Sequence, residues 1–393
     1  MGEKQVKNVG MIGYSFMGKA HSHAYKDVPF FFSDLSTVPK KKIICGRTKK
    51  LVAQAADKFG WEEYRTDWRD VVADPDIDII DIVVPPFLHS EIAVAAAEEG
   101  KDVICEKPPA LNYAQAREMA DSAKKSGVRN MIGFNYRRVP AVALAKKLID
   151  DGYIGEIRHF RGVYLQDWCM DPDFPLTWHF QKDKAGSGPT GGLHSHLVDL
   201  ARFLVGDISE VSGLTKNFVT KRPIQKSGEE LETKLTASSE GGEGEVGVED
   251  AALFLAKFNN GAVGTFEATH FAAGRKNHEG FEVNGSKGSL KFNFEKMNRL
   301  KVYSAQDPEE TQGFKDVLVT EDSHPYIKAW WPPGHLIGYE NTFVNEIAEF
   351  FSSYDEGEKP KPDFNDGRKC QRVLDAVLKS ADTSRWIEVD SIK

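Results

Sequence analysis

The chain has 393 residues, more than one hydrophobic core usually serves, so we expect two domains. Its 40% hydrophobic and 28% charged residues are typical of a globular protein, and it has no run of about 18 apolar residues that would cross a membrane. A net charge of −8 without a basic cluster argues against nucleic acid as the main partner.

The N-terminal residues MGEKQVKN lack the basic and then apolar pattern of a secretory signal, which predicts a cytoplasmic protein. The four cysteines are far apart and form no C-x-x-C pair. We therefore expect reduced, mostly buried thiols rather than a zinc site or a disulfide framework.

The first motif is an apolar run at 9–12, typical of a buried parallel strand, followed by a glycine-rich turn and a helix from Met17. Gly13, Ser15 and Gly18 have the spacing of a G-x-G-x-x-G loop, in which glycines allow a tight turn and a close approach to a pyrophosphate. The helix N-terminus offers free N–H groups to phosphates. The alternative is an ordinary glycine turn. We predict cofactor contacts at Gly13, Ser15, Phe16, Met17 and Gly18.

Strand and helix patterns alternate through the first third of the chain. Strands are expected at 41–45, 78–84, 102–105 and 128–134, and helices at 49–59, 90–99 and 112–127. This alternation predicts a parallel sheet of right-handed β-α-β units, a Rossmann-type domain over residues 1–134. Ligands bind beyond the carboxyl ends of such strands. Further cofactor contacts are therefore expected at Pro85, His89, Glu106, Lys107 and Asn135. The alternative for His89 is that it caps the helix that follows it and does nothing else.

The end of the second strand usually distinguishes the two nicotinamide dinucleotides. An acidic residue there accepts the ribose hydroxyls of NAD, and an arginine accommodates the extra phosphate of NADP. This chain has Gly46 and Arg47 and no acid at that point. Both residues are expected to contact the cofactor, and the choice between NAD and NADP stays open.

After Pro140 the pattern changes, which predicts a second domain over residues 135–393. Helices are expected at 141–150, 194–205, 339–354 and 367–386, and strands at 156–166, 211–214, 251–258, 264–271 and 281–284. The later strands have an antiparallel pattern, with a hairpin turn at 259–261. We expect residues 227–249 to form an exposed excursion, and residues 323–338 to form a loop over a site or a subunit contact.

Lys107 follows a predicted strand directly, in the tripeptide Glu106-Lys107-Pro108. A lysine beside nicotinamide and substrate can orient a hydroxyl group, and burial lowers its pKa. The alternative is a surface Glu-Lys pair. We predict that Lys107 is catalytic and contacts the substrate, and that Pro108 fixes the turn, with a cis bond before it as an option.

The segment Gly191–Asp199 carries a second candidate, His196. A histidine near its normal pKa can take a hydroxyl proton while hydride leaves the carbon, so we predict that His196 is catalytic. Two histidines and a carboxylate could instead hold a metal, but His194 and His196 are two residues apart and diverge on a helix. We therefore expect no metal and leave helix packing as the alternative for both histidines.

Polar residues interleaved with aromatic ones form a third group. Such surfaces hold sugars, because hydroxyls receive hydrogen bonds while rings cover C–H faces. The alternative for each residue is ordinary packing. The predicted substrate contacts, besides the two catalytic residues, are Tyr136, Arg137, Gln166, Asp167, Trp168, His179 and His194.

Together these motifs resemble the Gfo/Idh/MocA family of NAD(P)-dependent oxidoreductases, across nearly the whole chain. The resemblance rests on IGYSFMGKAHS, PPFLH, CEKPPA, FNYRR, GGLHSHLVDL and EVNGSKGSL. It implies a Rossmann domain followed by an α/β domain with a large, open, mostly antiparallel sheet, which commonly builds a homo-oligomer contact. It also implies oxidation of a sugar or cyclitol hydroxyl with Lys107 and His196 at the reacting group. Within the family the chain is most similar to members that act on pyranosides.

The chain departs from the family pattern at one catalytic position. Many members have Gly-Asp-x-Gly-x-His where this chain has Gly191–His196, so Gly192 replaces an acid. His194 or Asp167 is a candidate for the lost polar contact.

We therefore expect a dehydrogenase that converts a secondary ring hydroxyl of a sugar, glycoside (at C3) or cyclitol into a ketone. Two alternatives remain: a glycosidase that oxidises its substrate transiently with bound NAD, and a non-catalytic sugar or cofactor sensor.

Overall fold

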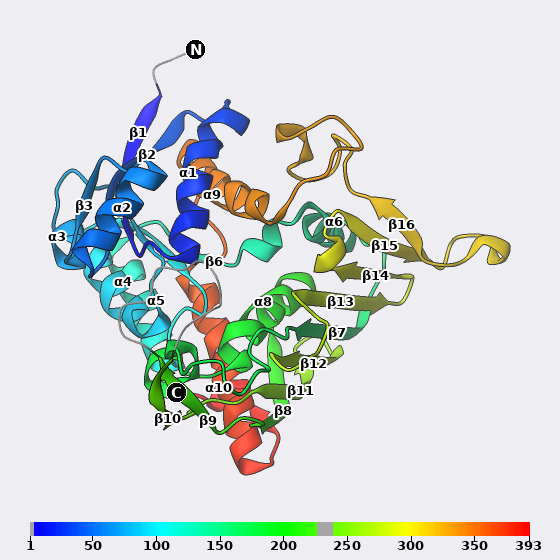
Figure 1. Ribbon diagram of the computed structural model, residues 1–393. Coiled ribbons are helices and arrows are strands. Elements are labelled where there is room, and N and C mark those ends of the chain that lie inside the picture. The colour runs from blue at the N-terminus through cyan, green and yellow to red at the C-terminus, as the bar shows by residue number, and fades with distance from the viewer. Residues whose placement is uncertain (1–3, 226–238) are drawn as a thin grey trace.

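A parallel sheet of six strands, in the order β3-β2-β1-β4-β5-β6, forms the N-terminal part of the computed structural model, which describes residues 4–225 and 239–393 (Figure 1). Its strands are β1 (Gln5–Ile12), β2 (Thr37–Cys45), β3 (Glu63–Arg65), β4 (Ile79–Ile82), β5 (Asp102–Glu106) and β6 (Asn130–Gly133). The inner strand β4 and the edge strand β6 are both buried throughout, as expected for a sheet covered on both faces.

Helices follow the strands of this sheet as the periodicity predicts. They are α1 (Phe16–Phe31), α2 (Lys49–Phe59), α3 (Trp68–Val72), α4 (His89–Glu98) and α5 (Tyr113–Ser126). Gly60 and Gly127 end α2 and α5 in the left-handed conformation, and the Asn112 side chain caps α5 by accepting a hydrogen bond from the backbone N–H of Gln115. The short elements β3 and α3 were not predicted.

A second sheet of nine strands forms the other half of the molecule (Figure 1). In sheet order it contains β16 (Lys315–Leu318), β15 (Arg299–Ser304), β14 (Gly288–Asn293), β13 (His278–Gly285), β7 (Ile157–Leu165), β12 (Val263–Thr269), β11 (Ala251–Phe258), β8 (Ile208–Lys216) and β17 (Ile387–Glu388). All neighbours are antiparallel except β7 and β12. The predicted fold class, a Rossmann domain plus an α/β domain with a mostly antiparallel sheet, is confirmed.

Helices α6 (Pro140–Asp150) and α8 (Ser195–Leu204) pack against this sheet, α6 on β14 and β15 and α8 on β7. Helix α7 (Lys182–Ala185) is short. The expectation of an exposed excursion at 227–249 holds for residues 241–247, which are exposed or half-buried, although β10 (Ser239–Glu245) also pairs with β9 (Lys221–Gln225) in a separate two-stranded sheet and residues 248–249 are buried. Residues 226–238 lie outside the described part of the chain.

The two last helices return to the Rossmann part. Helix α9 (Tyr339–Glu356) packs along α1, and α10 (Phe364–Thr383) packs against both α5 and β8 (Figure 1). Residues 323–338 form the predicted loop, but it lies on the end of α1, where the Trp330 ring is 4.3 Å from that of Phe31. The domain boundary at residue 134 stays a prediction. In the described residues, no helix has the length and apolar character needed to cross a membrane.

Candidate active site

The turn between β1 and α1 brings backbone unusually close to backbone. Gly13 has φ +118°, and a Cβ atom there would lie 2.7 Å from the Val83 carbonyl oxygen. A Cβ at Gly18 would lie 2.8 Å from the Gly13 carbonyl oxygen. Ser15 is the exposed N-cap of α1, so the first helix N–H groups face out beside the turn. This cradle fits the pyrophosphate of a dinucleotide.

The variant Gly18→Val is expected to weaken NADH binding by at least about tenfold, because its side chain would push the helix off the turn that approaches the pyrophosphate. Fluorescence titration of the purified protein with NADH measures this change. Gly313→Val is the matched control, because a Cβ at that position meets no atom within 4 Å. Unchanged affinity in Gly18→Val would place the cofactor elsewhere.

The end of β2 is shaped by a tyrosine ring. A Cβ at Gly46 would lie 1.9 Å from Cε1 of Tyr14, so only glycine leaves room for that ring. Arg47 is exposed at the end of the strand, and Phe16 stacks on Tyr339 across the neighbouring opening with 6.2 Å between ring centroids. Pro85 begins the short helix η1 (Pro86–Leu88) on the same rim. The cofactor contacts expected of these residues stay predictions.

Three predicted cofactor residues instead turn their side chains into the protein. Both ring nitrogens of His89 lie near backbone carbonyls, 2.9 Å from Pro108 and 2.7 Å from Val84. The Asn135 amide donates to the hydroxyl of Thr342 at 2.8 Å. These contacts join strand ends to helices, so the structure does not support direct cofactor contacts by the two side chains.

The third of these residues, Glu106, belongs to a buried ionic cluster behind the rim. The ring of His21 lies 2.9 Å from Asp81 Oδ2 and 3.2 Å from Glu106 Oε1, and the two carboxylates raise its pKa well above the usual value against the opposing effect of burial. Glu106 Oε2 accepts the backbone N–H of Lys107 at 3.0 Å. The cluster therefore holds the backbone from which the Lys107 side chain projects.

Lys107 reaches from the Rossmann part to the second domain. Its ammonium donates a 3.0 Å hydrogen bond to the carbonyl oxygen of Gly192, and the bond between Lys107 and Pro108 is cis. Burial lowers the pKa of Lys107, while Glu106 and Glu279 oppose that effect. The ammonium is thus fixed in place at the junction of the two sheets.

His196 lies in the first turn of α8 beside that junction. Its ring stacks on Tyr136 with 4.3 Å between centroids and contacts the edge of Phe134. Burial lowers the pKa of His196 well below 6.5, and the positive charge of Lys107 lowers it further. The imidazole is therefore neutral at pH 7 and available to accept a proton. The charge of Lys107, the other predicted catalytic residue, thus acts on the ring of His196.

His194 points the other way, as the spacing predicts, but it does not reach the substrate side. It ends the π-helical turn η4 (Thr190–His194), is fully buried, and meets the edge of Phe254 at 4.9 Å. Within the described residues neither ring nitrogen has a hydrogen-bond partner, and burial lowers its pKa to about 3. The expectation that His194 contacts substrate is wrong for this reason.

The Arg137 side chain also pairs with a group inside the protein and does not face a substrate. Its guanidinium makes a two-pronged pair with the buried Asp199 carboxylate, with Nε 2.7 Å from Oδ2, and stacks over Phe203. The expected substrate contact is therefore not supported, because the donors of Arg137 lock η2 (Asn135–Arg138) onto α8. The carboxylate of Asp199, which the sequence places on the same helix face as His196, accepts both hydrogen bonds of Arg137.

Arg137→Met is expected to destabilise the fold by about 3–5 kcal/mol, since it leaves a buried carboxylate without its counter-ion. Chemical denaturation followed by fluorescence measures the loss. Arg158→Met, at an exposed position on β7, is the control and is expected to change stability little. Equal stability of the two variants would contradict this role of Arg137.

A series of hydrogen-bonded polar side chains lies at the carboxyl end of β7, in the middle of the second sheet. The Tyr136 and Tyr164 hydroxyls are 2.8 Å apart, and Tyr164 donates to Asn277 Oδ1 at 2.8 Å. Gln166 donates to the same Asn277 oxygen at 2.7 Å and accepts from the indole N–H of Trp168 at 3.0 Å. This series includes the predicted substrate residues Tyr136, Gln166 and Trp168. It extends from Tyr136, which stacks on His196, to the aromatic loop after β7.

Aromatic rings close the far side of this series. Trp168 lies 5.5 Å from the ring of His179 and 5.2 Å from the ring of His270. Burial lowers the pKa of His179 to about 4, and the positive charge of Lys107 acts in the same direction. Asp167, in contrast, accepts from Lys276 at 2.8 Å and from the backbone N–H of Gly274 at 3.1 Å. Its carboxylate therefore does not replace the acid missing at Gly192.

Sequence reasoning did not predict three residues near this site: Tyr164, His270 and Glu279. Tyr164 and Glu279 are directly opposite on β7 and β13. Strand alternation could have found Tyr164, because it shares a face with Gln166 and Trp168. Glu279 is fully buried without a hydrogen-bond partner in the described chain, and burial raises its pKa well above the usual value against the opposing charge of Lys107.

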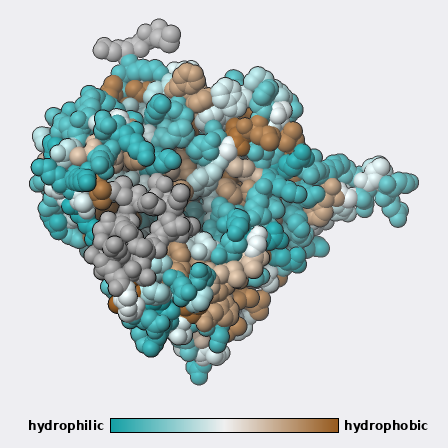
Figure 2. Space-filling view, viewed as in Figure 1, coloured by the Kyte–Doolittle hydropathy of each residue, from teal (hydrophilic) through white to brown (hydrophobic). Residues whose placement is uncertain are grey.

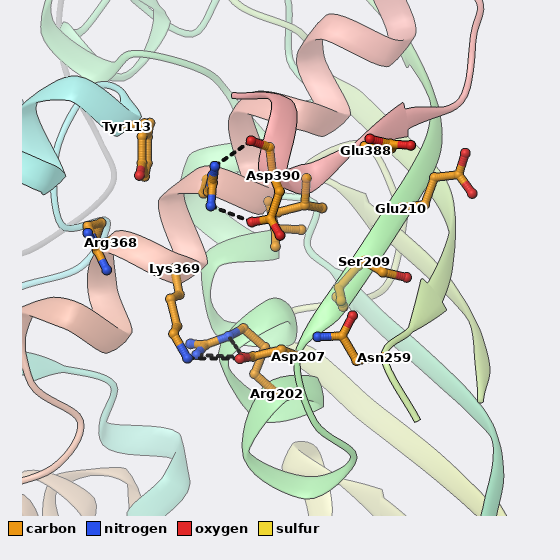
Figure 3. Close-up of a pocket in the computed structure, with 14 residues that line it drawn as sticks. Tyr113, Arg202, Asp207, Ser209, Glu210, Asn259, Arg368, Lys369, Glu388 and Asp390 are labelled. Carbon is orange, nitrogen blue, oxygen red and sulfur yellow. Dashed lines mark hydrogen bonds and ion pairs between the residues drawn. The ribbon is translucent and has the colours of Figure 1, made fainter. Parts of the chain in front are cut away.

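A separate cavity of about 430 Å³ lies between α10, β8 and the C-terminal residues (Figure 3). Asp207 faces both Arg202 and Lys369 there, at 2.9 and 2.8 Å, and Arg372 pairs with Asp390. These charges neutralise one another, so the cavity offers no evident ligand site. In the part of the chain that the structure describes, no three His, Cys, Asp or Glu side chains are arranged to hold a metal ion.

Both parts of the chain match known protein families. Residues 7–134 match the family described as an oxidoreductase family with an NAD-binding Rossmann fold, and residues 142–291 match the GFO/IDH/MocA C-terminal domain. A levoglucosan dehydrogenase from Pseudarthrobacter phenanthrenivorans is 44% identical over 386 residues, covering 98% of each chain. A scyllo-inositol 2-dehydrogenase from Bacillus subtilis is 29% identical over 65% of this chain and 67% of its own.

Solved structures agree with these matches. A levoglucosan dehydrogenase in complex with NADH and levoglucosan has a TM-score of 0.92 and 44% identity, over 98% of this chain and all of the other. An oxidoreductase domain protein from Kribbella flavida has a TM-score of 0.92 and 48% identity, over 98% and 99%. The expected similarity to pyranoside-oxidising members is confirmed. The chain therefore belongs to the Gfo/Idh/MocA family of oxidoreductases.

Proposed function

We propose that the protein is an NAD-dependent dehydrogenase that oxidises a secondary ring hydroxyl of levoglucosan, or of a related pyranoside, to a ketone. The observation that carries this proposal is the position of the Lys107 ammonium, which donates to the Gly192 carbonyl four residues before His196 and whose charge acts on the His196 ring. The levoglucosan dehydrogenase that was solved with NADH and levoglucosan supports both the cofactor and the substrate class.

The residues of this chain divide the reaction between them. Lys107 donates a hydrogen bond to the substrate oxygen, and its positive charge stabilises the alkoxide that develops there. His196 takes the hydroxyl proton; Nδ1 is buried without a partner in the described residues, which leaves Nε2 for this step. The C–H bond gives its electron pair to NAD as hydride, and the carbon becomes the ketone.

The test is reduction of NAD or NADP by the purified protein, followed at 340 nm, with levoglucosan, glucosides and inositols. We expect NADH formation with levoglucosan or another pyranoside and a ketone as product. Free sugar released from a glucoside without net NADH would favour the NAD-dependent glycosidase. Binding of NADH without turnover of any substrate would contradict the proposal and favour a sensor.

We propose further that the outer face of the nine-stranded sheet joins two copies of the chain. Leu214, Leu253, Leu255 and Val263 share that face and are 41–63% exposed. The face is grooved, with about 520 Å³ between its side chains. Figure 2 shows hydrophobic residues gathered in the lower part of the molecule, around β8 and β11. Such contiguous apolar patches mark interfaces.

Sedimentation velocity tests this interface with the double variant Leu253→Glu and Leu255→Glu. We expect the wild type to sediment as an oligomer and the variant as a smaller species. Tyr64→Glu is the control, because Tyr64 is 36% exposed on β3 of the other sheet. A monomeric wild type, or an unchanged oligomer in the double variant, would exclude this face.

A further inference from the structure

His270 stands at a position that the reaction scheme above leaves without a role. It follows β12 directly, and β12 runs parallel to β7, so His270 lies beside Gln166 at the same edge of the sheet. Its backbone is fixed on two sides, because its N–H donates to Asp250 and its carbonyl accepts from the Cys169 thiol. The ring is thus held at the rim of the sugar-binding edge.

The ring of His270 faces the backbone that holds the catalytic ammonium. A Cβ atom at Gly192 would lie 3.9 Å from Cε1 and 4.0 Å from Nε2 of His270. The Gly192 carbonyl accepts the Lys107 ammonium at 3.0 Å. Because Gly192 has no side chain, nothing from that residue separates the imidazole from the space in front of Lys107. The other side of the ring rests against Trp168.

The surroundings keep this imidazole uncharged. Burial lowers the pKa of His270 to about 3, and the neighbouring groups His179, Lys107 and Arg222 act in the same direction. Asp250, whose backbone carbonyl accepts the His270 N–H, uses its carboxylate to accept the backbone N–H groups of Phe218 and Val219. A neutral imidazole has one acceptor nitrogen. The site therefore places an acceptor at His270 beside a donor at Lys107.

We propose that His270 is a specificity-determining residue, whose ring nitrogen accepts a hydrogen bond from a sugar hydroxyl adjacent to the one that is oxidised. The pairing suits an uncharged vicinal diol, since one hydroxyl faces the ammonium and its neighbour donates to the imidazole. Trp168 then covers a C–H face of the same sugar ring. This inference rests on the proposed function and assigns His270 no part in proton or hydride transfer.

Two variants separate hydrogen bonding from packing. His270→Phe keeps a ring against Trp168 but removes the acceptor, whereas His270→Asn keeps an acceptor and loses the ring. For levoglucosan we expect His270→Phe to raise KM at least tenfold, with kcat within about threefold of the wild type and NADH affinity unchanged. His270→Asn is expected to recover most of the loss in KM. The control is His159→Phe, at the opposite end of β7.

Each outcome decides the proposal. An unchanged KM in His270→Phe, while the wild type and His159→Phe oxidise levoglucosan, would overturn the role of His270 and leave the dehydrogenase function intact. A larger rise in KM for His270→Asn than for His270→Phe would also overturn it, because the ring would then act by packing and not as a hydrogen-bond acceptor. A wild-type protein that oxidises no sugar would remove the proposed function, and this inference would fall with it.

Discussion

Replacing Lys107 with methionine is expected to lower kcat by about 10³-fold, because the variant loses the only cation that the described structure places at the Gly192 carbonyl. Methionine has a similar length and no charge, so the packing between the domains is retained. The effect should appear in kcat rather than in cofactor affinity, since the pyrophosphate cradle is formed by a different segment. Steady-state kinetics with levoglucosan and NADH titration measure the two quantities.

The matched control is Lys125→Met, on the exposed surface of α5. It is expected to retain wild-type kcat and NADH affinity. Full turnover by Lys107→Met would show that the ammonium does not act on the substrate oxygen. Loss of NADH binding in the same variant would instead assign Lys107 to the cofactor.

The second large effect is expected for His196→Gln, which should lower kcat by about 10²–10⁴-fold, the usual contribution of a positioned general base. Glutamine fills similar space beside Tyr136 but cannot take a proton at neutral pH. His194→Leu is the control, because His194 is buried against Phe254 and takes no part in the site. A large loss in His194→Leu with full activity in His196→Gln would exchange the two roles.

The pH dependence follows from the same two residues. The pKa of His196 is lowered, so the base stays neutral through neutral pH, and activity should fall only as pH drops through that lowered value. The pKa of Lys107 is also lowered, so activity should fall again as pH rises through it, earlier than for an exposed lysine. The profile of kcat/KM should therefore be bell-shaped. A profile with no acidic limb in the wild type would contradict the role of His196.

The Rossmann part was predictable because its signals are local. The turn of Gly13 and Gly18, the cap at Asn112 and the stop at Gly60 each depend on residues close in sequence. The nine-stranded sheet was only partly predicted. Strands β14 to β17 were missed, since short alternating strands carry a weak signal and their partners lie far away in sequence.

The candidate site was predictable only where one segment carries the chemistry. Lys107 and His196 stand out by motif, whereas His270 becomes visible only when β12 is placed beside β7. The errors have the same origin. Arg137 and His194 have side chains typical of sugar sites, and only tertiary packing shows that Asp199 and Phe254 occupy them.

The central claim is that Lys107 and His196 act together on one ring carbon that gives its hydride to NAD. Levoglucosan labelled with deuterium at C2, C3 and C4, the carbons that carry its secondary hydroxyls, tests it most directly, by mass spectrometry of the nicotinamide product. We expect reduced cofactor that carries one deuterium and an equal amount of a ketone, both lost in Lys107→Met and His196→Gln. Unlabelled NADH, or no NADH from a protein that binds the cofactor, would contradict it.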